Sequence, residues 1–311
     1  MPLLPLFVDS RHEIRSGWKF VAYSTLLVFL FIVASLATGG LIYLLDPAFL
    51  LLARSDIRFL GLNAIVLFIP ASVAFFIMAR FVDRIPLAAF GITPHDRWLR
   101  DLSAGVALAV GMLGITIVGS FLFGKVQMQW NASVMAIPAL ATTVAVLLIS
   151  ALNEELVFRG YPLQVLLKGI GPWAAILLVS SIWALLHARN EGATVLSTLN
   201  TIIAGVFFSR AYMETRSIWL PYGIHIGWNV GTAVVLGVPV SGIETASLLK
   251  TQVSGPPSIV GGGYGPEDGL LGTVIFLAGA IVIRRMRIGK VSPQVQTALA
   301  AHADKVYIEE V

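Results

Sequence analysis

The 311-residue chain contains no cysteine. This absence excludes disulfides, zinc–thiolate and haem–thiolate sites, and cysteine nucleophiles. Charged residues are also scarce, at 12% of the chain against roughly 25% in soluble domains. They form no block of like charge, so the sequence predicts no nucleic-acid partner.

Apolar residues are abundant instead. They make up 57% of the chain, against roughly 45–50% in soluble domains, and the mean hydropathy is +0.85. A soluble protein of this length has too little interior to hide that much apolar surface from water. The sequence therefore predicts an integral, multi-pass membrane protein surrounded by lipid.

Runs without Asp, Glu, Lys or Arg mark the candidate membrane spans. A hydrocarbon core about 30 Å thick requires about 20 helical residues, and seven runs are long enough. The eighth, of 15 residues, crosses only if Arg284 and Arg285 extend to the interface. We expect an all-α, polytopic membrane helix bundle of about eight transmembrane helices, forming one domain over residues 1–311. The expected spans are Phe20–Leu45, Phe59–Ala79, Leu102–Gly124, Val126–Asn153, Gly169–Ala188, Gly192–Ser209, Ser217–Ile243 and Gly269–Ile283.

The basic residues are distributed unevenly between the two sides of such a bundle. With eight spans, both termini and the second, fourth and sixth connections share one side. That side holds sixteen of the 21 Lys and Arg residues, and the other side holds five. Because basic residues favour the cytoplasmic side, we expect both termini in the cytoplasm.

Polar side chains interrupt the apolar spans in three places, and ionisable groups there are costly and usually functional. The three clusters are Glu154, Glu155 and Arg159 in the fourth span; Trp183 and His187 in the fifth; and His225 and Asn229 in the seventh.

Helical spacing separates the residues of the first cluster. Glu155 and Arg159 are four apart and share a face, so they can form an ion pair. Glu154 points about 100° away from Glu155 and is free to face another element. The alternative is that all three charges simply lie at headgroup level where the span ends.

The turn Gly169–Pro172 lies midway between Glu154 and His187, 15 residues from each. If the two helices run antiparallel from this turn, both side chains lie about 22 Å from it and can meet. A helix break at Gly160–Pro162 would shift that height.

His225 and Asn229 are also four apart and share a helix face. The alternative for this pair is an interhelical hydrogen bond that only stabilises the bundle, by about 1 kcal/mol. For Trp183, on the same face as His187, we expect packing. Together the clusters contain a carboxylate base, two imidazoles and a carboxamide, which suits amide hydrolysis.

The ordered motifs resemble a known family, the CAAX-processing and bacteriocin-processing (CPBP) membrane proteases, which include the type 2 CAAX prenyl endopeptidases. The family pattern is two glutamates, three residues and an arginine, then Phe-x-x-x-His, then His-x-x-x-Asn/Asp. The resemblance covers residues 136–240, spans four to seven, which we expect to form the catalytic core. The departure is Trp183 where Phe is usual, a change of aromatic bulk that we expect to leave the chemistry intact.

The resemblance implies an intramembrane endopeptidase, a CAAX prenyl protease 2-like hydrolase, in the cell membrane of a bacterium or archaeon. Its partners would be membrane lipids and a peptide or protein substrate, lipid-modified or not. By the same resemblance the roles are water activation by Glu154 with help from His187, oxyanion stabilisation by His225 and Asn229, and support of the architecture by Glu155 and Arg159.

No cofactor is predicted. A His-Glu-x-x-His helix is absent from the sequence, although Glu154, His187 and His225 are also compatible with zinc. Two other functions remain open. A proton-coupled carrier would use the buried Glu and His groups as a relay, and would show paired broken helices in its two halves. A non-catalytic immunity or scaffold protein would tolerate Glu154→Ala.

The positions of His225 and His187 along their expected spans indicate the side of the membrane to which the site opens. His225 lies about 12 Å from the expected cytoplasmic start of its span, while His187 lies about 22 Å from its turn. We expect a cavity in the cytoplasmic half of the bilayer.

Overall fold

The computed structural model describes residues 4–9, 12–52, 56–131, 137–286 and 289–307, so position 136, the first of the expected catalytic core, lies outside the described residues. Helices dominate, which confirms the all-α fold class. The elements are α1 (Leu4–Phe7), α2 (Ser16–Leu45), η1 (Pro47–Leu51), α3 (Ile57–Ile77), η2 (Met78–Asp83), η3 (Leu87–Phe90), α4 (Trp98–Phe123), β1 (Lys125–Trp130), α5 (Ile137–Glu154), η5 (Glu155–Gly160), α6 (Tyr161–Ile170), α7 (Pro172–His187), α8 (Val195–Thr215), α9 (Trp219–Asn229), η6 (Val230–Leu236), β2 (Leu249–Ser254), α10 (Pro257–Val260), η7 (Pro266–Asp268), α11 (Leu270–Met286) and α12 (Pro293–Ala300).

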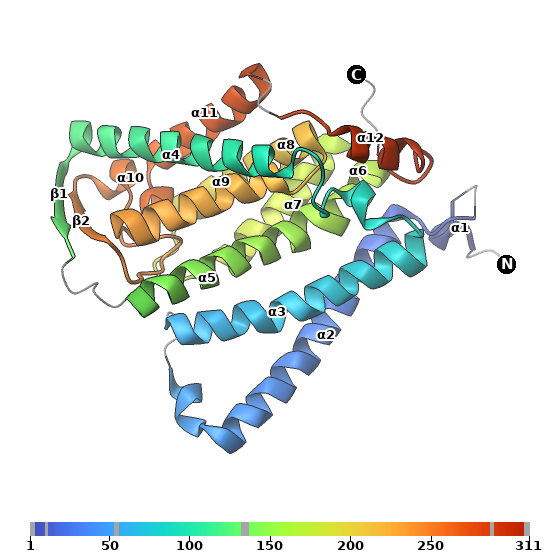
Figure 1. The fold of residues 1–311 in the computed structure, drawn as a ribbon, viewed down its shortest axis with the longest axis horizontal. Helices are drawn as coiled ribbons and strands as arrows, with labels where there is room; N and C mark the ends of the chain where they lie inside the picture. The colour runs from blue at the N-terminus through green and yellow to red at the C-terminus, as the bar shows by residue number, and fades with distance from the viewer. Residues whose placement is uncertain (1–3, 10–11, 53–55, 132–136, 287–288, 308–311) are drawn as a thin grey trace.

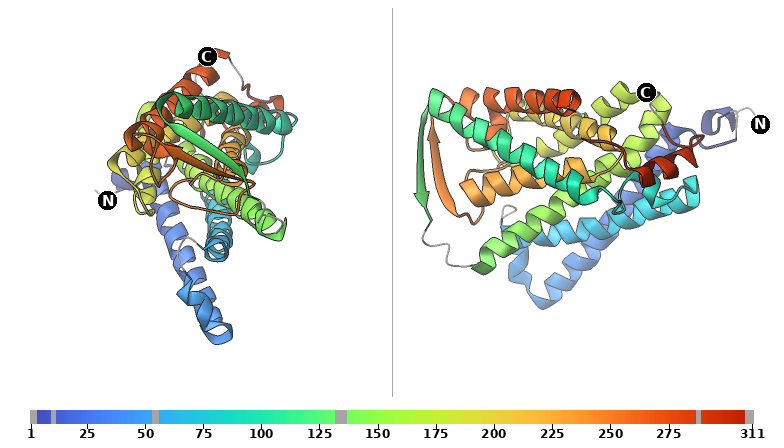
Figure 2. Two further views of the ribbon diagram at one scale, coloured as in Figure 1. Left: turned by 90° about the vertical axis from the view of Figure 1, so that its left-hand side faces the viewer. Right: turned by 45° about the horizontal axis from the view of Figure 1, so that its top comes forward.

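The long helices run between two ends of the molecule (Figure 1). Strands β1 and β2 pair antiparallel at one end, and both termini lie at the other. Helix α4 packs along α9, and α8 packs between α7 and α11. Helices α2 and α3 form a hairpin whose α2 arm diverges from the bundle toward η1 (Figures 1 and 2).

Four stretches of the described chain are long and apolar enough to cross a membrane: Ser16–Leu45, Ile57–Asp83, Trp98–Phe123 and Ile137–Ile170. Helix α7 is apolar but shorter. Large apolar side chains also cover the surface, with Leu36 and Leu44 exposed by 71% and 78%. Such a surface is stable in lipid and unfavourable in water. The remaining expected spans correspond to α8, α9 with η6, and α11, and their crossing stays a prediction.

The fourth expected span begins later than the uncharged run suggests. Residues Lys125–Trp130 form β1, because Val126, Met128 and Trp130 alternate with glutamines in the two-residue period of a strand. The helix starts at Ile137 instead.

The same helix also ends later than the expected boundary. It continues through η5 and α6 to Ile170, with a bend at Gly160, where ψ is −112°. Pro162 is tolerated because it occupies the first turn of α6, where a backbone N–H has no helical partner.

Glycines bring α4 and α9 into close contact. A Cβ on Gly223 would lie 2.2 Å from the carbonyl oxygen of Leu102, and one on Gly105 would lie 2.4 Å from that of Leu220. Small residues permit this approach of two helix backbones in a membrane. The contact fixes α9, the helix that carries His225, against α4.

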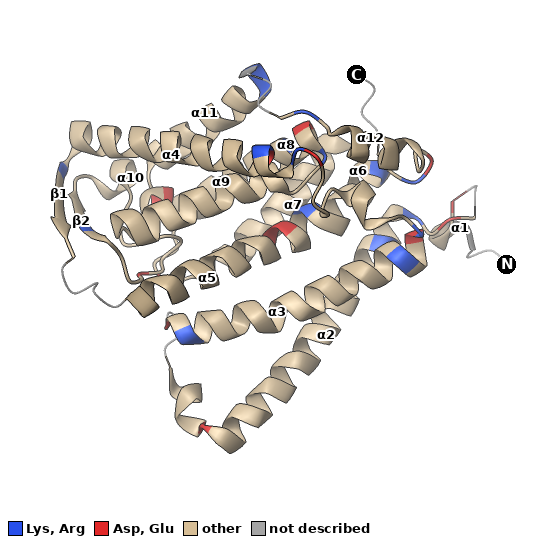
Figure 3. Ribbon diagram, in the orientation of Figure 1, with Lys and Arg blue, Asp and Glu red and all other residues tan. Residues whose placement is uncertain are grey.

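Lys and Arg gather toward the end of the molecule that carries the termini, and the β1–β2 end has few (Figure 3). This distribution agrees with the bias counted from the sequence. The orientation in the membrane stays a prediction.

Candidate active site

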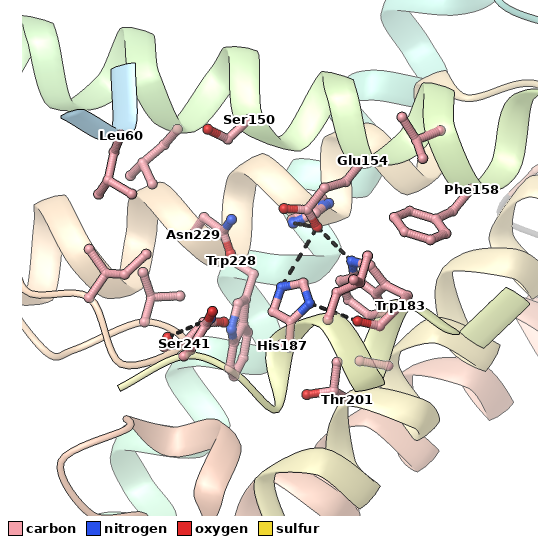
Figure 4. Close-up of a pocket in the computed structure, with 18 of the residues that line it drawn as sticks. Leu60, Ser150, Glu154, Phe158, Trp183, His187, Thr201, Trp228, Asn229 and Ser241 are labelled. Carbon is pink, nitrogen blue, oxygen red and sulfur yellow. Dashed lines mark hydrogen bonds and ion pairs between the residues drawn. The ribbon is translucent and has the colours of Figure 1, made fainter. Parts of the chain in front are cut away.

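Glu154 is the last residue of α5, and its Oε2 atom is the meeting point of three helices (Figure 4). Nε1 of Trp183 donates a hydrogen bond to this oxygen at 2.7 Å. Nε2 of His187 lies 3.9 Å from it and Nε2 of His225 lies 3.8 Å from it. The predicted meeting of Glu154 and His187 across the Gly169–Pro172 turn is therefore confirmed.

Glu155 and Arg159 form a buried ion pair directly behind Glu154. Both residues are fully buried, and Nη1 of Arg159 lies 3.3 Å from Oε1 of Glu155. The same oxygen accepts a hydrogen bond from Nδ1 of His225 at 2.9 Å, and Nη2 of Arg159 donates to the carbonyl of Gly205 at 3.3 Å. The predicted pair is confirmed, and its burial rules out exposed headgroup-level charges for these two residues.

Hydrogen bonds orient both imidazoles in the same sense. Nδ1 of His187 lies 3.0 Å from the carbonyl oxygen of Trp183, and Nδ1 of His225 lies 2.9 Å from the Glu155 carboxylate. Both partners accept only, so we assign the proton to Nδ1 in each ring. Each Nε2 then faces Glu154, as an acceptor when the ring is neutral and as a donor when it is protonated.

Two segments of π-helix begin directly after site residues. Segment η5 follows Glu154, and η6 follows Asn229. π-Helical turns are rare and occur frequently at functional sites. Sequence reasoning at 3.6 residues per turn missed both, because that periodicity assumes a regular helix.

A cavity of about 540 Å³ adjoins these residues. This volume lies within the range of about 300–1,000 Å³ typical of small-molecule sites. Of the six predicted site residues, Glu154, His187, His225 and Asn229 line the cavity. Glu155 and Arg159 lie behind its wall. Helices α2, α3 and α5 contribute apolar side chains to the wall of the cavity, including Leu27, Val28, Phe31, Ile57, Leu60, Leu67, Val146 and Leu147.

The cavity extends from Glu154 toward the β1–β2 end of the bundle. Its lining includes Ile57 at the start of α3 and Thr245 before β2. If both termini are cytoplasmic, this end faces away from the cytoplasm; the expected cavity in the cytoplasmic half of the bilayer stays a prediction. At the α8–α9 connection, Arg216 and Ser217 are buried. Helix α9 therefore starts inside the protein, and its first residue does not mark a membrane surface.

Glu267 is a buried carboxylate that sequence reasoning missed. Its Oε1 accepts from Nε1 of Trp228 at 2.8 Å, and its Oε2 accepts from the backbone N–H and hydroxyl of Ser241 at 2.7 and 2.8 Å. These hydrogen bonds fix the side chain of Trp228, which directly precedes Asn229 in α9. Glu267 lies in the three-residue 3₁₀ helix η7 between two expected spans, which is too short for helical periodicity to give a signal.

A second cluster contains serine, histidine and aspartate but lacks the protonation pattern of a triad. Nδ1 of His95 accepts from the backbone N–H of Arg97, so Nε2 carries the proton and donates to Ser217 Oγ at 3.0 Å. The serine hydroxyl donates in turn to Gly91 O at 3.0 Å. His95 therefore cannot act as base toward Ser217, although Asp101 lies 3.7 Å from its ring.

Among the residues that the structure describes, no group of three or more His, Cys, Asp and Glu side chains is arranged to hold a metal ion. The metal-free hypothesis stays a prediction, because it concerns the reaction and requires a biochemical test.

Comparison with known proteins agrees with the motifs. Residues 136–231 match the family model described as type II CAAX prenyl endopeptidase Rce1-like. An Escherichia coli protein described as "Uncharacterized 24.3 kDa protein" is 26% identical over 149 residues, which covers 42% of this chain and 68% of that protein. No solved structure matches the chain. The family match confirms the resemblance drawn from the sequence motifs.

Proposed function

We propose that this membrane protein, whose residues 136–231 carry the type II CAAX prenyl endopeptidase-like domain, is an intramembrane endopeptidase that uses Glu154 to activate water. At the level of the family, the match supports a protease. The observation that carries the finer proposal is the convergence of Glu154, His187 and His225 within 3.9 Å at the wall of a cavity.

In the proposed reaction, Glu154 removes a proton from water as the water oxygen attacks the scissile carbonyl carbon. The carbonyl π electrons move to oxygen, giving a tetrahedral oxyanion. Glu154 then returns the proton to the amide nitrogen as the carbon–nitrogen bond breaks. Nε2 of His187 faces the same carboxylate and orients the water as a hydrogen-bond acceptor.

The oxyanion needs donors fixed before the reaction begins. His225 is suited to this role in its doubly protonated form, because Glu155 accepts from Nδ1 and leaves Nε2–H to donate into the cavity. Asn229 follows one helical turn later and lines the same cavity. Glu155 and Arg159 act through His225, by holding its ring and balancing its charge.

The wall of the cavity supports an apolar substrate segment, lipid-modified or not. Residues of α2 and α3 supply aliphatic and aromatic side chains to the wall of the cavity that Glu154 also lines. A peptide with an apolar tail would place the tail against α2 and α3 and its scissile bond at Glu154.

The test is cleavage of a fluorogenic CAAX-type peptide, in farnesylated and unmodified forms, by the purified protein in nanodiscs. Glu154→Gln keeps the size of the side chain and removes the base, so we expect a loss of at least about 100-fold. Glu214→Gln is the matched control, because Glu214 pairs with Arg210 on α8, away from the cavity.

Equal cleavage by wild type and Glu154→Gln would refute the role of Glu154. Absence of cleavage of both peptides by folded wild-type protein would contradict the proposed activity on this substrate class. A preference for the farnesylated peptide would support an apolar subsite along α2 and α3.

A further inference from the structure

We propose that Trp183 is a positioning residue for Glu154: its indole N–H holds one carboxylate oxygen and leaves the other to face the cavity. This inference rests on the proposed function, because it concerns how the base is held. It reverses the expectation that tryptophan in place of phenylalanine changes only bulk.

Trp183 contacts Glu154, His187 and Arg159. Its Nε1 donates to Glu154 Oε2 at 2.7 Å, and its carbonyl oxygen accepts from His187 Nδ1 at 3.0 Å (Figure 4). The indole ring centroid lies 4.8 Å from the imidazole of His187 and 4.8 Å from Cζ of Arg159. With 4% exposure, the ring is held on all sides and offers its N–H in one fixed direction.

The indole bond makes the two oxygens of Glu154 inequivalent. Trp183 and both imidazoles face Oε2, at 2.7 to 3.9 Å. Within the described part of the chain, Oε1 has no hydrogen-bond partner, and Glu154 lines the cavity. Oε1 is therefore the oxygen left for water. A phenylalanine ring has no donor and would leave the carboxylate free to rotate about its last torsion.

Removal of this donor has two measurable consequences. A donated N–H bond favours the charged form of a carboxylate, so without it the acid side of the pH–activity profile should move to higher pH. A less oriented base should also lower kcat, by about tenfold. The charged groups facing Glu154 are His187 and His225 at the cavity and the Glu155–Arg159 pair behind it, and all four are retained in the variants below.

The sharpest variant replaces Trp183 with 3-benzothienylalanine, which keeps the shape of the ring and lacks the N–H. Trp183→Phe is the simpler companion. The matched control is Trp219→Phe, because Nε1 of Trp219 donates to the carbonyl of Thr93 at 3.2 Å outside the site. Both Trp183 variants should show the shifted acid limb and lower kcat, and the control should show the wild-type profile.

If the benzothienylalanine enzyme keeps the wild-type acid limb and kcat, the proposal is overturned. This holds even if Trp183→Phe is impaired, because that pattern would show that Trp183 acts only through the packing of its ring. An independent readout is the infrared titration of the Glu154 carboxylate, assigned by its loss in Glu154→Gln. If wild-type protein cleaves no peptide, the proposed function fails separately, and an infrared midpoint unmoved by benzothienylalanine would still overturn the role of Trp183.

Discussion

Substitution of Gly223 by alanine should displace His225 and Asn229, the proposed oxyanion donors, although the added methyl group contacts neither residue. The added Cβ would lie 2.2 Å from the carbonyl oxygen of Leu102. A tolerated carbon–oxygen contact is about 3.3 Å, so α9 must move away from α4 by about 1 Å. His225 and Asn229 move with it, and a misplacement of about 1 Å at a catalytic group costs about 100-fold in rate. Overpacking should also cost roughly 1–3 kcal/mol of stability.

The assay is a graded alanine series, measured by peptide cleavage and by thermal unfolding of the purified protein. Gly227→Ala should have a smaller effect, because its Cβ would lie 2.8 Å from the Cβ of Ala109. Gly111→Ala is the control, since nothing lies within 4 Å of the added atom, and it should be as active and at least as stable as wild type. Wild-type activity and Tm for Gly223→Ala would refute the reasoning that the close α4–α9 contact sets the position of His225.

Four further outcomes are expected. Glu267→Gln gives Trp228 or Ser241 an amide donor in place of an acceptor and should lower stability by roughly 1–3 kcal/mol, seen as a lower Tm. Burial lowers the pKa of His95, so the unfolded chain binds the proton more readily. The stability should therefore fall as the pH drops below about 6.5, and His95→Gln, which keeps a donor and an acceptor, should reduce that fall in pH-dependent melting curves. Chelator treatment should leave peptide cleavage unchanged, whereas loss of activity restored specifically by zinc would contradict the metal-free hypothesis. Thr245→Cys should react with a membrane-impermeant thiol reagent on intact cells, because Thr245 lines the cavity at the end opposite the termini, and labelling confined to inverted vesicles would contradict that orientation.

The parts of the site that could be predicted are those set by spacing along single helices and across one short turn. Glu155 and Arg159 meet because they are four residues apart in one continuous helix. Glu154 and His187 meet because helices joined at Gly169–Pro172 must return at the same height. In a bilayer the backbone groups of a span must bond within the span, so the helical register is strongly constrained.

Contacts between elements distant in sequence could not be predicted in this way. The hydrogen bond from His225 to Glu155 depends on how α9 packs against α4. Gly223 permits this packing because it has no Cβ atom. The indole N–H of Trp183 points at Glu154 only after α5 and α7 have docked. The burial of Arg216, a charged residue expected at the surface, could not be predicted either, because it depends on how the α8–α9 connection packs.

The charges of the proposed site connect its burial to its chemistry. Glu154 and Glu155 contribute two negative charges and Arg159 one positive charge, so the group is neutral when one imidazole is protonated. A buried net charge in a membrane protein is costly, which favours this balance. His225, at 2.9 Å from one carboxylate and 3.8 Å from the other, is the imidazole better placed to hold the proton. Under the proposed function, a proton on His225 gives its ring the Nε2–H that an oxyanion requires.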